Sequence, residues 1–146
     1  MLTYRDFVYA AFKDYAAAQT AVVLIPKEIE TERLKRETLK AAQTDGDRVS
    51  GGDVSKEDAW VSSIAKESYL AAKLAMARNV VETMDRLMEE LDKDTRELVQ
   101  RTIMAHRHYA VEELAKERGL DPRTVYRAKD QALKDLARML TGEARA

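Results

Sequence analysis

The stretch AVEELAKERGLDPRTVYRA, residues 110–128, has the pattern of two short helices joined by a tight turn. Ala115 is small enough to sit where two helices cross, and Gly119, four residues later, tolerates the positive φ that such a turn requires. Asp121 is placed to cap the second helix, and Pro122 fits its first position. The apolar positions expected to close the pair are Leu114, Leu120 and Val125. This spacing predicts a helix-turn-helix within residues 110–140.

The second helix of this pair has two different faces. Its buried stripe is expected to be Ala128, Ala132, Leu133 and Leu136. The side chains expected to reach base edges in a major groove are Arg123, Tyr126, Arg127 and Asp130. Those expected at backbone phosphates are Lys116, Thr124, Lys129, Lys134 and Arg107, and the neighbouring His106 and His108 are candidates as well. The pattern therefore predicts binding to double-stranded DNA, against the alternative of a helix pair that only packs.

Charge is distributed unevenly along the 146 residues, whose formal net charge is −1. The stretch from Arg123 to Arg138 contains five cationic and two anionic residues, so its net charge is +3 and that of the rest of the chain is −4. A local basic face on a mildly acidic protein suits DNA binding with modest non-specific affinity.

The residues before this region predict long helices. Thr3 and Asp6 form a candidate capping box for a helix over residues 3–24, and Pro26 is expected to end it and to start a second helix over 26–43. Residues 44–54 hold three of the five glycines and are predicted to be a loop. A third helix is predicted over 55–91, so that 1–91 form a helical arm and 92–146 a second domain.

The third helix carries a heptad seam. Its members are Leu70, Leu74, Ala77, Val81, Met84, Met88 and Leu91. Such a seam must be buried, either against the two preceding helices of the same chain or against a second copy in a homodimer through residues 55–91. The sequence leaves both arrangements open.

Composition restricts the class of protein. Apolar residues make up 45% of the chain, glycine and proline are scarce, and alternating strand patterns are missing, so the expected fold is all-α. There is no cysteine, which excludes disulfides and thiolate metal sites. No stretch is apolar enough to span a membrane, and the start lacks the pattern of a secretory signal, so a cytoplasmic location is expected. His106 and His108 diverge on a helix, and no nucleophile is paired with a base, so we expect no metal, no cofactor and no enzymatic activity.

The C-terminal residues resemble region 4 of bacterial sigma factors, which reads promoters. The matching residues are Glu113-Leu114-Ala115, Gly119-Leu120, Arg123-Thr124-Val125, Ala132-Leu133 and Leu136. The helix from Leu91 through Arg96 to Ile103 fits the first helix of that region. One departure is Arg118, where the family has an apolar residue, and it suggests looser or partner-covered packing. The resemblance implies a coiled-coil-like helical hairpin followed by a region 4-like DNA-binding domain.

The whole chain is similar to small phage and prophage regulators of late genes, of the ArpU and RinA type, in which a polar loop such as Val49–Asp53 and a long helix precede a sigma-like domain. This resemblance implies control of late-gene transcription, with RNA polymerase as a further partner. No stretch resembles the sigma region that melts promoters. Two alternatives stay open: a DNA-packaging protein like a small terminase subunit, and an interaction module that docks on RNA polymerase without binding DNA.

Overall fold

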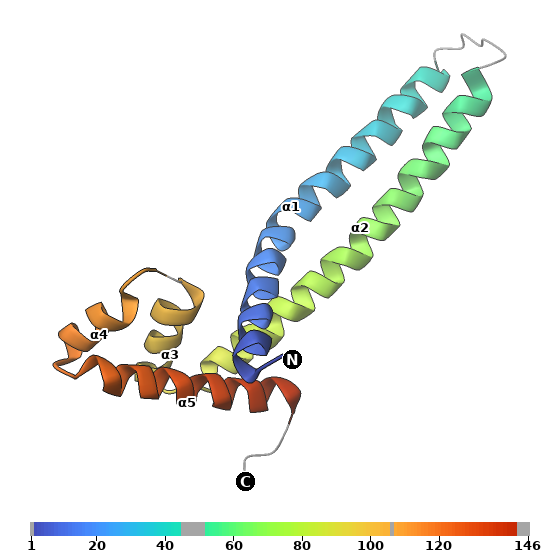
Figure 1. Ribbon diagram of the computed structural model, residues 1–146. Helices are drawn as coiled ribbons and strands as arrows, with labels where there is room; N and C mark the ends of the chain where they lie inside the picture. The colour runs from blue at the N-terminus through green and yellow to red at the C-terminus, as the bar shows by residue number, and fades with distance from the viewer. Residues whose placement is uncertain (1, 45–51, 106, 143–146) are drawn as a thin grey trace. The chain divides into compact units, whose positions relative to one another are not determined.

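A computed structural model describes residues 2–44, 52–105 and 107–142 (Figure 1). Its elements are α1 (Tyr4–Thr44), α2 (Gly52–Glu89), α3 (Lys93–Val99), the π-helical segment η1 (Gln100–Met104), α4 (Ala110–Arg118) and α5 (Pro122–Thr141). The described residues contain helices and no strand, which confirms the all-α expectation.

The first helix is longer than predicted. Thr3 and Asp6 form the expected capping box, with Thr3 N donating to Asp6 Oδ2 at 3.0 Å and Asp6 N donating to Thr3 Oγ1 at 3.3 Å. The predicted break at Pro26 is wrong, because α1 continues through it to Thr44. Proline removes one backbone hydrogen bond, but Ile25 is buried and Ile29 is partly buried in one apolar cluster with α2. Tertiary packing on both sides of Pro26 therefore holds the helix together.

The second long helix begins three residues earlier than expected and ends two residues sooner. The predicted loop over 44–54 is wrong for Gly52, Asp53 and Val54, which belong to α2, and Thr44 is the last residue of α1. Residues 45–51 of that loop, including Val49, lie outside the described residues. Asp92 then caps α3, accepting a hydrogen bond from Thr95 N at 2.7 Å, which matches the expected break after Leu91.

The chain divides into two compact units. Unit 1 contains residues 1–16 and 82–146, and unit 2 contains residues 17–81. The predicted boundary between 91 and 92 therefore differs from the structure, since both ends of the predicted arm belong with the C-terminal helices. The reason is tertiary: the hydroxyl of Tyr15 donates to Asp85, and that of Tyr4 donates to Asp130 on α5. Burial, together with the contact to Asp85, raises the pKa of Tyr15 to about 12.

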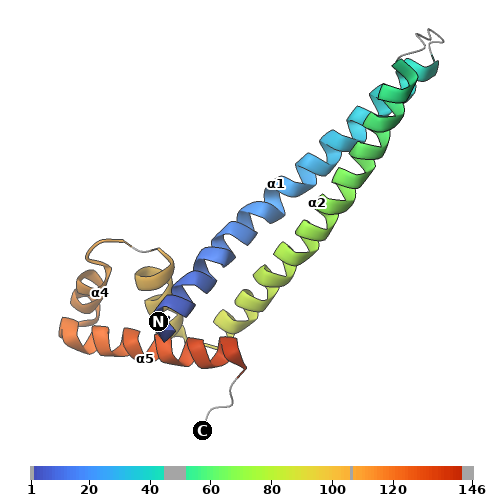
Figure 2. The ribbon, with the colours of Figure 1, turned by 45° about the vertical axis from the view of Figure 1, so that its right-hand side comes forward.

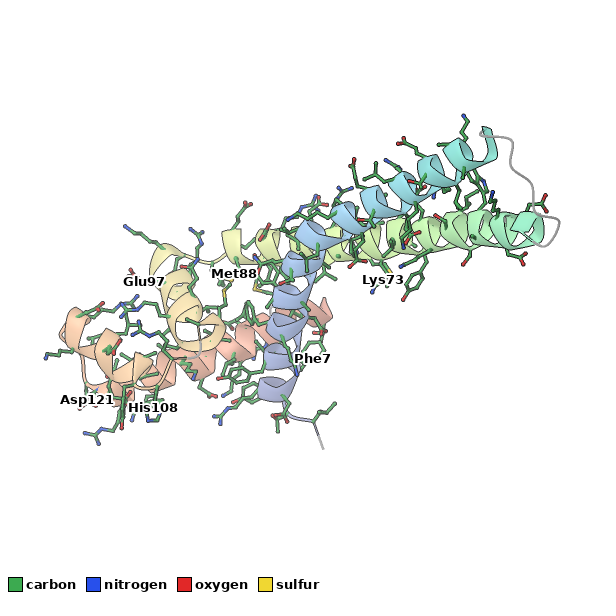
Figure 3. The ribbon with its side chains drawn as sticks, turned by 90° about the horizontal axis from the view of Figure 1, so that it is seen from above. Phe7, Lys73, Met88, Glu97, His108 and Asp121 are labelled. Carbon is green, nitrogen blue, oxygen red and sulfur yellow. The ribbon has the colours of Figure 1, made fainter. Side chains whose placement is uncertain are left out.

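In unit 2, α1 and α2 run side by side in opposite directions (Figures 1 and 2). Leu70 and Leu74 of the predicted seam are buried with Ile25 of α1, so this part of the seam packs within the chain. In the same unit Ala77 is buried and Val81 is partly buried, while the seam residues Met84, Met88 and Leu91 belong to unit 1 and are buried there. Lys73 lies on the outside of α2, pointing away from α1 (Figure 3).

A charged network also joins α1 to α2 in unit 2. Glu32 is only 3% exposed. Its carboxylate accepts a hydrogen bond from Ser63 Oγ at 2.9 Å and forms an ion pair with Lys66 Nζ at 3.1 Å. Lys66 and Ser63 lower the pKa of Glu32 to about 2. One turn away, Glu67 accepts from Arg36 at 2.9 Å, which lowers the pKa of Glu67.

In unit 1, Arg96 fixes the connection between α2 and α3. Its guanidinium donates to the carbonyl oxygens of Met88 at 3.0 Å, Glu89 at 3.1 Å and Leu91 at 2.9 Å. The carbonyls of Met88 and Glu89 lie in the last turn of α2, where helical N–H partners run out, and that of Met88 also accepts from Leu91 N at 3.2 Å. In the helix that follows, Leu98, Val99, Thr102 and Ile103 are all buried.

Candidate nucleic-acid interface

The connection between α4 and α5 has the geometry that the sequence predicted. Gly119 ends α4 with φ +67, a conformation that costs any residue with a Cβ about 1–2 kcal/mol. The backbone of Leu120 then donates to the carbonyl of Ala115 at 2.8 Å, which closes the turn. Asp121 caps α5 by accepting from Arg123 N at 2.8 Å, and Pro122 is the first residue of α5. The turn and both helix ends are therefore fixed by local contacts.

Most of the predicted apolar positions lie in the core. Leu114 is fully buried, and Ala115 and Val125 are each 2% exposed. The prediction that Leu120 closes the turn is wrong, because this residue is 45% exposed and covers the turn only in part. Ala128 is also exposed and does not join the buried stripe of Ala132, Leu133 and Leu136. Ala128 instead lines an open cavity with Leu98 and Arg118, which keeps its methyl group accessible.

The side chains expected at DNA lie on the outer surface of α4 and α5. Arg123, Thr124, Arg127, Lys116, Lys134 and Arg107 are exposed, whereas Lys129 is partly buried with its Nζ 5.9 Å from the centre of the Tyr9 ring. Arg123 has an 84% exposed side chain and only a loose ion pair, 3.4 Å, to Asp121. Arg127 and Lys116 have no ion pair among the described residues. The first two turns of α5 therefore carry exposed cations.

Tyr126 links the two helices at this surface. Its hydroxyl donates to Glu112 Oε1 on α4 at 2.8 Å while its side chain stays 48% exposed. The hydrogen bond raises the pKa of Tyr126 and lowers that of Glu112. The ring of Tyr126 is therefore held at one position beside Arg127, where a flat aromatic surface is available to a ligand.

Asp130 does not lie free at the interface. Its Oδ1 accepts from the Tyr4 hydroxyl and from Arg5 Nη2 at 2.9 Å, and its Oδ2 is 3.3 Å from Lys134 Nζ. Tyr4 and Arg5 lower the pKa of Asp130 to about 2. Because these partners occupy the carboxylate oxygens, Asp130 is not available to accept hydrogen bonds from DNA bases. No local pattern predicts this contact, because Tyr4 and Arg5 precede Asp130 by 126 and 125 residues.

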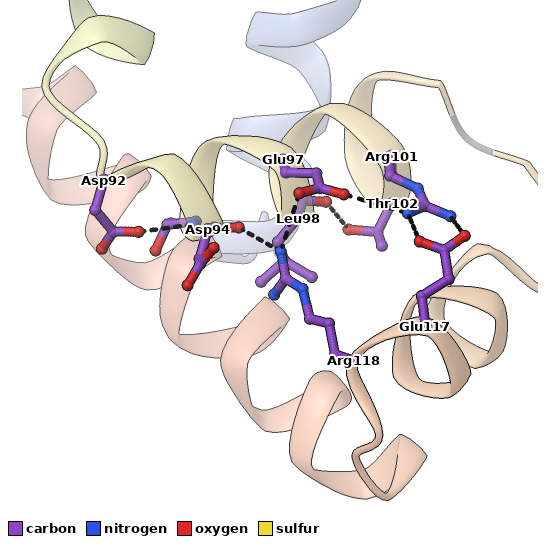
Figure 4. A network of polar contacts seen from close by, with 9 residues as sticks. Asp92, Asp94, Glu97, Leu98, Arg101, Thr102, Glu117 and Arg118 are labelled. Atoms are coloured by element: carbon purple, nitrogen blue, oxygen red, sulfur yellow. Dashed lines mark hydrogen bonds and ion pairs between the residues drawn. The ribbon is translucent and has the colours of Figure 1, made fainter.

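Arg118 takes part in an ionic network that joins α3 and η1 to α4 (Figure 4). It donates to the carbonyl oxygen of Asp94 at 3.0 Å and lies 3.6 Å from Glu97. Arg101 connects the same Glu97, at 3.3 Å, with Glu117, at 3.0 Å, and Glu117 raises the pKa of Arg101. Where looser or partner-covered packing was expected, the side chain of Arg118 is 25% exposed, pairs within the chain and borders the open cavity beside Ala128.

The segment before α4 has a second left-handed residue. Tyr109 has φ 63, which is rare for an aromatic residue, and its side chain is 65% exposed. Its ring packs against that of His108, with centroids 4.1 Å apart, while Arg107 is exposed next to them. His106, also expected near DNA, lies outside the described residues. Polar and aromatic groups thus lie at the start of α4.

The comparisons with protein-family models, with curated proteins and with solved structures give no match to this chain. Among the described residues, none of the helices combines the length and the apolar content needed to cross a membrane.

Proposed function

We propose that this protein binds double-stranded DNA sequence-specifically through a helix-turn-helix formed by α4 and α5, and that it regulates transcription. The observation that carries the proposal is the division of α5 into two sides. Val125, Leu133 and Leu136 are buried, while Arg123, Tyr126 and Arg127 are exposed on its first two turns. An exposed, basic first half of a capped second helix is what insertion into a major groove requires.

The individual roles follow from charge and position. Arg127 and Arg123 present guanidinium groups suited to bidentate contacts with guanine, and Tyr126 offers an apolar ring for contact with a thymine methyl. Lys116, Thr124 and Arg107 are exposed on neighbouring segments and are assigned to phosphates, together with Lys129 and Lys134. Double-stranded DNA is therefore the principal partner in this proposal.

The finer architecture belongs to the same proposal. In it, α1 and α2 form a coiled-coil-like hairpin, and α3 to α5 form a domain of the sigma region 4 type, as in phage and prophage regulators of late genes. Contact with RNA polymerase is a further expected property. Burial of Leu70 and Leu74 against α1 occupies part of the seam from which a homodimer was predicted. A dimer would thus use another face of the helix over 55–91.

The test is selection of bound fragments from the source genome at roughly physiological salt, followed by titration of the selected duplex. Arg127→Ala is expected to weaken binding to that duplex by roughly 1–3 kcal/mol, or about 5- to 150-fold. Arg78→Ala is the matched control, because Arg78 is an exposed arginine on α2 in unit 2. Equal affinity of the Arg127 variant and the control would remove Arg127 from the interface.

The outcome also separates the alternatives. Enrichment of one or a few promoter-like sites supports a regulator. A ring of many copies in solution, measured by mass, would favour DNA packaging instead. No enrichment by folded protein, together with no dependence of binding on salt, would contradict DNA binding and favour an interaction module for RNA polymerase.

A further inference from the structure

The start of α1 brings a cation to α5 that lies far away in the sequence. Arg5 Nη2 is 2.9 Å from Asp130 Oδ1, and the side chain of Arg5 is still 59% exposed. The Tyr4 hydroxyl donates to the same oxygen, and the Tyr4 ring lies between two cations, 5.7 Å from the Arg5 guanidinium and 5.8 Å from Lys134 Nζ. Arg5 is thus held at one position and remains accessible to solvent.

This position continues the exposed row on α5. Asp130 follows Arg127 by three residues and Arg123 by seven, spacings that return to the same side of a helix. At 1.5 Å per residue, Asp130 lies roughly 10 Å along the axis from Arg123. Between Arg5 and α5 lies an open cavity of about 190 Å³, lined by Arg5, Tyr9, Tyr126, Lys129, Asp130 and Leu133. The Arg5 guanidinium therefore borders the same surface as Tyr126.

The local charge is positive despite Asp130. Arg5, Lys129 and Lys134 contribute three positive charges, against the carboxylate of Asp130 and that of Glu112, which accepts from Tyr126 and interacts with Lys129. An isolated carboxylate at this place would repel phosphate. Asp130 is instead shared by Arg5 and Lys134 and holds these two cations in place, and the cluster keeps one positive charge in excess. A partly exposed ion pair contributes only about 0–1 kcal/mol to stability, so folding alone gives little reason for such a cluster.

We propose that Arg5 contacts the DNA backbone beside the groove entered by α5, with Asp130 as its positioning residue. The proposal rests on the DNA-binding function proposed above and adds the start of α1 to that interface. Phosphate is the expected target, because an arginine at the edge of a recognition helix meets the backbone before it meets base edges.

Titration of the selected duplex at several salt concentrations tests the contact. Loss of one phosphate contact is expected to reduce the slope of log K against log salt by about 0.9, so Arg5→Gln is expected to show this reduction and Arg5→Lys to retain most of the slope. Arg33→Gln is the matched control, because Arg33 is 64% exposed and pairs with Glu67 at 2.7 Å within unit 2. An unchanged slope for Arg5→Gln would overturn the proposal.

A second measurement reports the position of residue 5 relative to the DNA and does not rely on a change in affinity. The chain has no cysteine, so Arg5→Cys creates a single attachment point for an iron chelate that cleaves nearby DNA. Cleavage at the edge of the selected site is expected from residue 5 and not from residue 33. Cleavage from residue 131, which is exposed on α5 and has no proposed contact with DNA, but none from residue 5 would overturn this contact and leave DNA binding by α5 intact. No binding of the duplex by the unsubstituted protein would overturn both.

Discussion

The interior of unit 1 and that of unit 2 are stabilised by different kinds of contact. The largest fully buried side chains, Leu114, Leu136, Val8 and Val99, all belong to unit 1, where all five helices and η1 contribute residues. In unit 2, which is a pair of helices, Ile25, Leu70 and Leu74 each keep 4–8% of their surface, and the charged Glu32 is as buried as they are. Two helices share only one interface and enclose few side chains completely. Unit 2 therefore depends more on directional polar contacts, and unit 1 on close packing.

Truncation of the core gives the largest expected effect. Leu114→Ala is expected to lower the free energy of unfolding by an amount near the upper end of about 2–5 kcal/mol, because the cavity left in unit 1 is closed on all sides. Leu74→Ala in unit 2 is expected near the lower end, because its site is 8% exposed and can collapse or admit water. Urea unfolding followed by circular dichroism compares them. If both variants lose the same free energy of unfolding, the core of unit 1 is not packed more closely than that of unit 2.

Acid is expected to act on both units through their buried or paired carboxylates. Folding lowers the pKa of Glu32 and that of Asp130 to about 2 each, so both groups stabilise the folded state above the unfolded pKa of about 4. This stabilisation is lost as pH falls from about 5 towards 2. Glu32→Gln and Asp130→Asn are each expected to flatten this pH dependence, the former more strongly because Glu32 is buried and Asp130 is 30% exposed.

Trp60, the single tryptophan, lies in unit 2, so its fluorescence follows the Glu32 variant, and circular dichroism follows both. Glu30→Gln is the control, since Glu30 is exposed on α1 of the same unit. An unchanged acid transition in the Glu32 variant would show that the polar network does not stabilise unit 2.

The two ends of α4 provide a smaller test within unit 1, because Tyr109 and Gly119 share a left-handed backbone. Gly119→Ala is expected to destabilise the protein by about 1 kcal/mol. The cause is conformational, since nothing lies within 4 Å of an added Cβ. Tyr109→Gly is expected to stabilise slightly, by about 0.5 kcal/mol, because strain relief exceeds the added entropy of the unfolded chain. Thermal unfolding checks both, with Gly119→Asn as a milder control; changes of the same sign would refute the assignment.

The smallest effect is expected at Arg118. Arg118→Leu loses the contacts with Asp94 and Glu97 and leaves Arg101 paired with Glu117. Because surface ion pairs contribute about 0–1 kcal/mol, the free energy of unfolding is expected to change by less than about 1 kcal/mol. If urea unfolding shows that the free energy of unfolding falls by more than about 2 kcal/mol, the ionic network in unit 1 is cooperative. Unit 1 would then depend on polar contacts much as unit 2 does.

Predictions that rest on neighbouring residues agree with the structure. The capping box of Thr3 and Asp6, the left-handed Gly119 and the caps at Asp92 and Asp121 each involve residues within a few positions of one another. Their geometry depends on the backbone conformation of one turn, which local sequence specifies. The buried stripes of α2, α3 and α5 follow for a related reason, since helical periodicity places their apolar residues on one side.

Predictions that needed knowledge of distant neighbours failed or were never made. Pro26 is tolerated because Ile25 and Ile29 pack with α2, and Leu120 and Ala128 are exposed because no other helix covers them. The contact of Tyr4 and Arg5 with Asp130 joins positions separated by most of the chain. The sequence by itself determined the all-α class, the capped starts of α1 and α5 and the turn between α4 and α5. Only the tertiary structure decided which helices pair, where the units divide and which charges meet, because these depend on contacts between residues that no local pattern connects.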